Sequence, residues 1–188
     1  MPNITTVALT KEQYKEIIET MRKGGKGFRP NERIATALIL EANLGMRISD
    51  ILALTPKNII KDGKRYRLNV VEKKTKKKRP FTVPNEIHTF IMDYCQKYEI
   101  EPTELLFPYT ERNIQKYLKK VTDYLGYENI GTHSFRKFFA TDIWEKNGYN
   151  IILVQQLLQH SSPTITQRYI GLSSEQMEHA LNEHIVLF

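Results

Sequence analysis

The stretch between Pro56 and Pro84 constrains the fold most, because its composition favours β-strands in a chain whose other segments favour helices. From residue 57 it reads KNIIKDGKRYRLNVVEKKTKKKRPFTVP, with runs rich in β-branched and aromatic residues. An Asp62-Gly63 pair and a basic connector separate these runs, as is typical of antiparallel hairpins. We therefore expect a mainly α fold with a small antiparallel β-sheet, of the α+β class.

Helix signals surround this stretch. Thr10 and Gln13 have the spacing of a capping box, Gly45 marks a helix end, and Pro84 marks a helix start. A short helix holding Tyr169 is expected after the Ser-Ser-Pro break at residues 161–163. The other expected helices cover residues 10–21, 31–44, 47–54, 84–97, 111–125, 132–148 and the segment from about residue 174 onward.

The chain is basic: 28 Lys and Arg against 21 Asp and Glu give a formal net charge of +7 and a pI of about 9.4. This balance favours a polyanionic partner, with nucleic acid ahead of a membrane surface. Its 188 residues suffice for one domain with a buried core. No apolar run approaches the roughly 20 residues that span a bilayer, and the N-terminus does not resemble a leader peptide, so a cytoplasmic protein is expected.

Cysteine and histidine usage argues against a disulfide or a metal site. Cys95 is the single cysteine, so an internal disulfide is excluded, and no Cys/His group has the spacing of a zinc site. We expect Cys95 to be a small core residue.

Two positively charged places could bind an anion. His133 and Arg136 lie three residues apart at the start of an expected helix, so they share a face beside the free N-terminal amides. Arg47 follows Gly45 into an otherwise apolar helix, where a charge needs a partner. Each place has a structural alternative: an ordinary surface pair for His133 and Arg136, and an ion pair with Asp50 for Arg47.

The run KKTKKKR at residues 73–79 holds six basic side chains in seven positions between two expected strands. Most charge runs of this kind are solvated loops. A two-stranded basic projection also fits a DNA groove, where lysine and arginine neutralise phosphates. Under this second interpretation, DNA contacts are expected from Lys73, Lys76, Lys77, Lys78 and Arg79.

In chain order, these groups resemble the catalytic domain of the tyrosine recombinase, or phage integrase, family. The matching stretches are LGMRISDI, KKT before FTVP, HSFRKFFAT, LLQHSS and TQRYI, and the match extends from about Leu9 to Leu172. Five such boxes in one order are far more specific than any one of them. The resemblance implies a catalytic domain at residues 1–172 and a C-terminal helix at residues 173–188 that docks on its own domain or on a neighbouring protomer.

The resemblance also implies roles for the matched residues. Tyr169 would be the nucleophile, and Arg47 and Arg136 would clamp the scissile phosphate. His133 and His160 would donate hydrogen bonds to that phosphate, with His133 also accepting the tyrosine proton.

Three further positions follow from the same match. A hairpin lysine would protonate the leaving 5′ oxygen: the KT pair favours Lys74, whereas counting back from Pro84 gives Lys76. Asp50 would orient the groups around the first arginine. Gln159 stands where the family usually has glycine, before the second histidine.

Elementary chemistry supports these roles. Attack on a phosphodiester builds negative charge on phosphate oxygens, and each positioned donor speeds such a reaction roughly 100 to 1000-fold. Arginine presents a planar fork to two oxygens, so two arginines can take the place of a metal. A tyrosine with the usual pKa of about 10 reacts near neutrality only with help from a base or from positive charge. We expect neither a metal nor a cofactor.

The implied function is site-specific DNA recombination through a 3′-phosphotyrosyl intermediate, giving integration, excision or inversion. The implied partners are double-stranded DNA with specific sites, three further protomers of a homotetramer on that DNA, and accessory DNA-bending proteins. Two alternatives stay open: a DNA-binding regulator with the same fold, and a topoisomerase-like nick-and-reseal enzyme. The family's helical core-binding domain is not matched, so the chain is either a fragment or a natural minimal enzyme from a bacterium, phage or mobile element.

Overall fold

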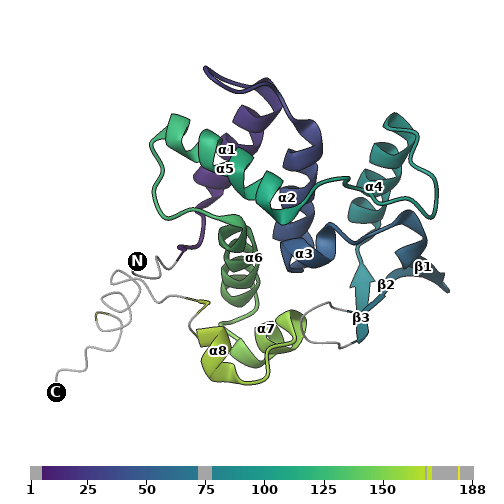
Figure 1. The fold of residues 1–188 in the computed structure, drawn as a ribbon. Helices are drawn as coiled ribbons and strands as arrows, with labels where there is room; N and C mark the ends of the chain where they lie inside the picture. The colour runs from purple at the N-terminus through teal and green to yellow at the C-terminus, as the bar shows by residue number, and fades with distance from the viewer. Residues whose placement is uncertain (1–5, 72–77, 168, 171–181, 183–188) are drawn as a thin grey trace.

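The computed structural model of the chain describes residues 6–71, 78–167, 169, 170 and 182. It confirms a mainly α fold with one small antiparallel sheet (Figure 1). In chain order the elements are α1 (Lys11–Lys23), α2 (Glu32–Leu44), α3 (Ile48–Ile51), the 3-10 helix η1 (Pro56–Asn58), β1 (Ile59–Asp62), β2 (Arg65–Val71), β3 (Lys78–Val83), α4 (Asn85–Lys97), α5 (Glu111–Leu125), α6 (Thr132–Lys146), α7 (Ile151–Leu158) and α8 (Pro163–Gln167).

Helix α2 is the centre of the helical part. Its residues Leu38, Leu40 and Leu44 are fully buried, and the helix packs against α1 and α6. The Asn31 side chain caps its first turn by accepting a 3.0 Å hydrogen bond from the Ile34 amide. At its other end the chain leaves the helix through a glycine and leads directly to α3. Arg47, the first candidate arginine, thus follows the end of α2, the helix that packs against α6.

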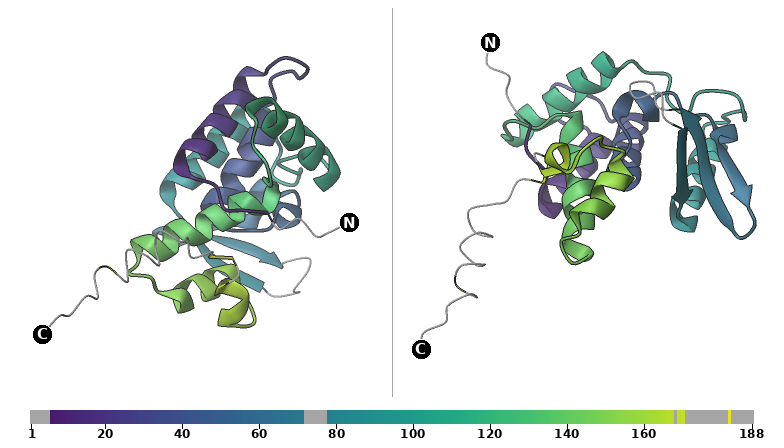
Figure 2. Two further views of the ribbon diagram at one scale, coloured as in Figure 1. Left: turned by 90° about the vertical axis from the view of Figure 1, so that its left-hand side faces the viewer. Right: turned by 90° about the horizontal axis from the view of Figure 1, so that it is seen from below.

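The three strands form one sheet in the order β1-β2-β3, with both pairs antiparallel. Strand β2 alternates as expected for a sheet with one covered face: Leu68 is buried, whereas Arg67 and Asn69 are exposed. Helix α4 packs on β2, and the sheet with α4 stands beside the helical part (Figure 2). Strands β2 and β3, which flank the basic connector in the sequence, therefore pair with each other.

A second, smaller core joins α6, α7 and the segment after α8. Its buried members are Phe139 and Ala140 of α6, Val154 and Leu158 of α7, and Ile170. Tyr169 is partly buried against the same cluster. Figure 1 shows α7 and α8 together beside α6, as their packing contacts require. This core fixes the candidate nucleophile against the helix that carries the His-x-x-Arg pair.

The helix predictions were accurate in position and less so at their ends. The Thr10–Gln13 capping box is present, with hydrogen bonds of 3.0 and 3.1 Å. The helix that begins at Thr132 ends at Lys146, two residues before the expected glycine. The prediction that Tyr169 lies within a helix was wrong: α8 ends at Gln167, and the Tyr169 amide donates to the Thr166 carbonyl in a turn. A five-residue helix has little stability of its own, so packing of Ile170 into the second core decides the local backbone.

Two other expectations concern single features. Cys95 is buried, as predicted. Among the described residues, no helix combines the length and the apolar character needed to cross a membrane. The expected C-terminal helix from about residue 174 lies outside the described residues, apart from position 182.

Candidate active site

The hydroxyl of Tyr169 lies 3.3 Å from Nδ1 of His133, so the two expected partners are brought together. His133 is the second residue of α6 and is exposed, whereas Tyr169 is partly buried after α8. The hydrogen bond either runs from the phenol to an unprotonated Nδ1 or from a protonated Nδ1 to the phenolic oxygen. In the first arrangement the imidazole is placed to accept the tyrosine proton.

His160 lies on the ring of the same tyrosine. The two ring centroids are 4.9 Å apart and the planes meet at 65°, a geometry that aromatic pairs favour. Nδ1 of His160 is 3.0 Å from the hydroxyl oxygen of Thr166, which is fully buried. This contact fixes the ring orientation of His160.

Gln159, the residue before His160, has a left-handed backbone with a φ of 53°. It is the cap that ends α7, a place where glycine is free of strain. The glycine that the resemblance implies at this position would adopt such a backbone without strain, and Gln159 adopts it with a side chain.

Arg136 is fully buried in α6. Its Nη1 donates to the carbonyl oxygen of Gly45 at 2.7 Å, and its Nη2 donates to the carbonyl oxygen of Leu158 at 2.9 Å. Gly45 lies two residues before Arg47, and Leu158 lies two residues before His160. One guanidinium thus ties together the turns that present two other candidate residues.

Arg47 and Asp50 both belong to the turn into α3. Arg47 is the N-cap of α3 and is partly exposed, whereas Asp50 is only 4% exposed. A cavity of about 190 Å³ is lined by Asp50 and Asn58 and, from strand β2, by Asn69 and Val70. Asp50 therefore lies beside the strand that leads to the basic connector.

The lysine of the hairpin is the part of the predicted site that the described structure leaves open. Lys73, Lys74, Lys76 and Lys77 lie outside the described residues, so the choice between Lys74 and Lys76 stays a prediction. Strand β3 places the backbones of Lys78 and Arg79 opposite Val71 and Val70 of β2. The connector thus joins two paired strands, as predicted.

Glu41 is a charged residue that the sequence did not single out. It lies in the last turn of α2 and is fully buried. Burial raises the pKa of its carboxyl well above the usual 4.5, although the charge of Arg136 acts in the opposite direction. Glu41 therefore holds its proton at pH values where an exposed glutamate is ionised.

Two polar residues near Tyr169 were also missed from the sequence. Thr166 holds His160, as described above, and no local spacing signals this contact. Lys137 lies 5.7 Å from the centroid of the Tyr169 ring. Lys137 lies four residues after His133, and residues four apart share a helix face. This spacing could have predicted that Lys137 lies on the same side of α6 as His133.

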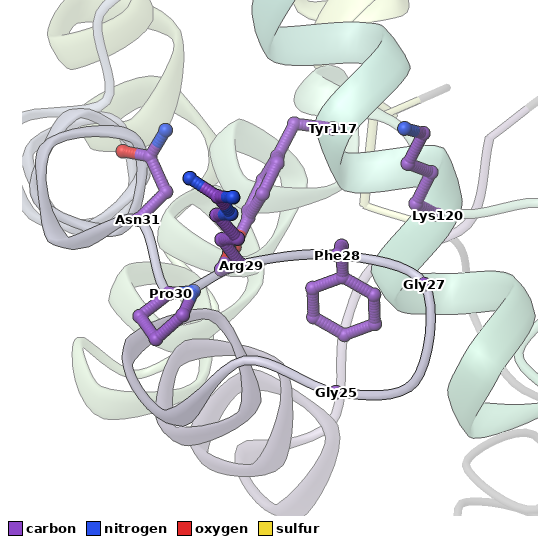
Figure 3. A pocket seen from close by; sticks show the side chains of 8 residues that line it. All are labelled: Gly25, Gly27, Phe28, Arg29, Pro30, Asn31, Tyr117 and Lys120. Carbon is purple, nitrogen blue, oxygen red and sulfur yellow. The ribbon is translucent and has the colours of Figure 1, made fainter.

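A separate concavity lies at the other end of α2 from Arg47, about 20 Å away by helix length. It has a volume of about 610 Å³ and is formed by the α1–α2 loop and α5. Figure 3 shows Phe28 and Arg29 of that loop and Tyr117 and Lys120 of α5 around it. None of the predicted catalytic residues lines it, so we locate the candidate active site at Tyr169.

Comparisons with known proteins show which sequences and folds the chain is similar to. Residues 8–176 match the sequence profile of the phage integrase family. The chain is 32% identical over 152 residues to the probable integrase/recombinase YoeC of Bacillus subtilis, covering 77% of this chain and 81% of the relative. It is 30% identical to the tyrosine recombinase XerC of Bradyrhizobium diazoefficiens, covering 77% of this chain and 47% of the relative. The chain thus spans about half the length of XerC.

Solved structures share the fold at lower sequence identity. The XerH recombinase in a post-cleavage complex with a palindromic difH substrate superposes with a TM-score of 0.75 at 21% identity, covering 97% of this chain and 54% of XerH. The catalytic domain of bacteriophage HP1 integrase gives 0.63 at 18% identity, covering 95% of both chains. The arrangement of helices around the small sheet is therefore that of a recombinase catalytic domain.

Proposed function

Because the chain belongs to the phage integrase family, we propose that it is a site-specific DNA recombinase with Tyr169 as its nucleophile. The observation that carries this proposal is the 3.3 Å contact between the Tyr169 hydroxyl and Nδ1 of His133. It joins a turn after α8 to the first turn of α6, next to the buried Arg136. The hydroxyl of Tyr169 is thus within reach of a group that can accept its proton.

In the proposed reaction the Tyr169 oxygen attacks the scissile phosphorus, and the bond from phosphorus to the 5′ oxygen breaks. The phenolic proton passes to His133, and the leaving 5′ oxygen takes a proton from a lysine of the basic connector. The product is a 3′-phosphotyrosyl ester and a free 5′ hydroxyl. Attack on this ester by the 5′ hydroxyl of another duplex restores a phosphodiester and exchanges the strands without an external energy source.

The remaining candidate residues would stabilise the charge that builds on the phosphate. Arg47 and His160 each follow by two residues a carbonyl that Arg136 holds, and both would donate hydrogen bonds to the phosphate. Arg136 lies at the start of the same helix as His133, where the helix N-terminus favours an anion. Asp50 would orient the groups around Arg47. Charged donors in a partly dry site stabilise a phosphoryl transition state without a metal or a cofactor.

The proposed partner is double-stranded DNA with specific recombination sites. The net charge of +7 and the basic connector favour it, with contacts from Lys73, Lys76, Lys77, Lys78 and Arg79. On that DNA we expect a homotetramer assisted by DNA-bending proteins, with residues 1–172 as the catalytic domain and residues 173–188 as a docking segment. Such an enzyme would be encoded by a bacterium, a phage or a mobile element and would work in the cytoplasm.

The decisive experiment traps the covalent intermediate. The substrate is a library of duplexes with randomised sequence and a nick just downstream of the cleavage position. Cleavage releases the short oligonucleotide between the two breaks. The 5′ hydroxyl needed for religation is then lost, so the covalent intermediate accumulates. We expect wild-type protein and Tyr149→Phe, which alters an exposed tyrosine, to retain DNA under denaturing conditions. Tyr169→Phe should retain none, and sequencing the trapped DNA would identify the target site.

The alternatives predict different outcomes. A DNA-binding regulator would select sequences from the library under native conditions and yield no adduct with any variant. A nick-and-reseal enzyme would form the Tyr169 adduct and relax supercoiled plasmids, but would give no recombinant product from two cognate sites. Equal adduct formation by wild-type protein and Tyr169→Phe would remove Tyr169 from the nucleophile role.

A further inference from the structure

Lys137 is a buried lysine in the site. It follows Arg136 in α6 and is only 8% exposed. Its ammonium donates a hydrogen bond to the backbone carbonyl of Thr6, in the segment that precedes α1. That segment is itself fixed, because the Val7 amide donates to the carbonyl of Asn129 at 3.1 Å. The lysine is thus held in place from outside its own helix.

The same ammonium faces the candidate nucleophile. Nζ of Lys137 lies 5.7 Å from the centroid of the Tyr169 ring, within the range of a cation–π contact. His133 contacts the hydroxyl of this tyrosine and His160 contacts its ring. The three basic groups therefore approach Tyr169 from α6 and from the end of α7.

We propose that Lys137 is a positioning residue for Tyr169, whose ammonium, anchored on the Thr6 carbonyl, orients the phenol ring and stabilises the negative charge that develops on it during attack. This inference rests on the proposed function, because it requires Tyr169 to be the nucleophile. Proton loss turns the phenol into an anion whose charge spreads over the ring, and a nearby cation favours that form. This attraction strengthens as less water screens the pair, and Lys137 is only 8% exposed.

A purely structural lysine would be an unusual choice at this place. Placing an ammonium in a nearly buried position is unfavourable, and a methionine of similar length would fill the same space without that penalty. Burial accordingly lowers the pKa of Lys137. A role for the charge itself accounts for an ammonium beside the aromatic ring.

The anchor also links the nucleophile to the segment before α1. If the Thr6 carbonyl moves away, the ammonium loses its acceptor and its fixed distance from the Tyr169 ring. The hydrogen bond between this segment and Asn129 therefore determines how firmly the Tyr169 ring is oriented for attack.

The test measures single-turnover adduct formation on a trapped cognate duplex between pH 6 and pH 9. We expect Lys137→Met to slow adduct formation about tenfold at pH 7, with a smaller deficit at pH 9, where phenol ionisation needs less assistance. Lys137→Arg keeps the charge and should recover most of the rate. Val7→Pro removes the amide N–H that docks the segment. This substitution alone should slow adduct formation, whereas adding it to Lys137→Met should slow adduct formation little further.

Three outcomes would overturn the inference. A wild-type rate for Lys137→Met would show that the ammonium is irrelevant. Equal losses for Lys137→Met and Lys137→Arg at every pH, with lowered unfolding temperatures, would show that the lysine serves packing alone. Failure of wild-type protein to form any adduct would refute the proposed function itself. This outcome differs from the first one, in which the wild-type protein and the Lys137 variants all form the adduct at the same rate.

Discussion

Arg136 donates a 2.7 Å hydrogen bond from Nη1 to the carbonyl oxygen of Gly45, and so ties α6 to the turn that presents Arg47. Gly45 has a left-handed backbone with a φ of 56°. A Cβ atom at this position would lie 2.4 Å from Cδ1 of Phe139. The position of the carbonyl that holds Arg136 therefore depends on a residue without a side chain.

Gly45→Ala should lower the free energy of unfolding by about 3 kcal/mol, because left-handed strain of about 1–2 kcal/mol adds to the displacement of Phe139. Urea denaturation measures this change. Adduct formation should also slow, because the carbonyl oxygen moves away from Arg136 as the turn shifts.

Gly126→Ala is the matched control. Gly126 also ends a helix in the left-handed region, with a φ of 73°, but nothing lies within 4 Å of a Cβ there. It should lose only about 1 kcal/mol of stability and keep its cleavage rate. Equal losses for the two variants would mean that the contact between Gly45 and Phe139 is unimportant.

The sequence predicted those features that short spacings encode. The Thr10–Gln13 capping box, the glycine that ends α2 and the hairpin around Asp62-Gly63 each arise from neighbours a few positions apart, so local rules found them. The candidate catalytic residues came from a resemblance spread over five boxes. No local rule placed them next to one another.

The missed features depend on packing between distant segments. The contact of Arg136 with Gly45 joins residues 91 positions apart, and the burial of Glu41 follows from α6 packing on α2. Tyr169 lies in a turn because Ile170 enters the second core. Such contacts depend on the assembled three-dimensional fold, which apolar periodicity along one helix does not determine.

Thr166→Val should slow adduct formation about tenfold. The threonine hydroxyl lies 3.0 Å from Nδ1 of His160, and loss of one such hydrogen bond is worth about 1 kcal/mol or somewhat more. Valine fills the same volume, so the ring of His160 loses its orientation while the packing of α8 stays. Single-turnover kinetics on a trapped duplex would measure the effect.

Thr164→Val makes the same chemical change at an exposed position of α8. This control should cleave at the wild-type rate. If both threonine variants were equally slow, a general effect on α8 would explain the result and the role of Thr166 in holding His160 would be refuted.

Glu41→Gln should stabilise the protein at neutral pH. Because the folded pKa of Glu41 is raised, the unfolded chain releases this proton near pH 4.5 while the folded protein keeps it. Wild-type stability therefore falls as pH rises from about 4.5 towards the folded pKa. Glutamine cannot ionise, so the gain should be seen at pH 7.5 and should shrink towards pH 5, as measured by urea denaturation.

Glu128→Gln removes the same formal charge from an exposed residue and should change stability little at either pH. A large loss of stability for Glu41→Gln at pH 7.5 would contradict the prediction. It would mean that Glu41 is ionised in the folded protein and serves as a counter-ion for Arg136.

The last prediction separates Lys74 from Lys76 as the acid that protonates the leaving 5′ oxygen. Replacing that oxygen by sulfur gives a leaving group that departs without protonation, so loss of a general acid is harmless on the sulfur substrate. Lys74→Ala should therefore slow cleavage of the oxygen substrate about 100 to 10,000-fold and leave cleavage of the sulfur substrate near the wild-type rate. Lys76→Ala should slow both substrates slightly and to the same extent, because it would remove only a phosphate contact. The reverse pattern would transfer the role to Lys76, and equal sensitivity of both substrates to both variants would exclude a general acid at these two positions.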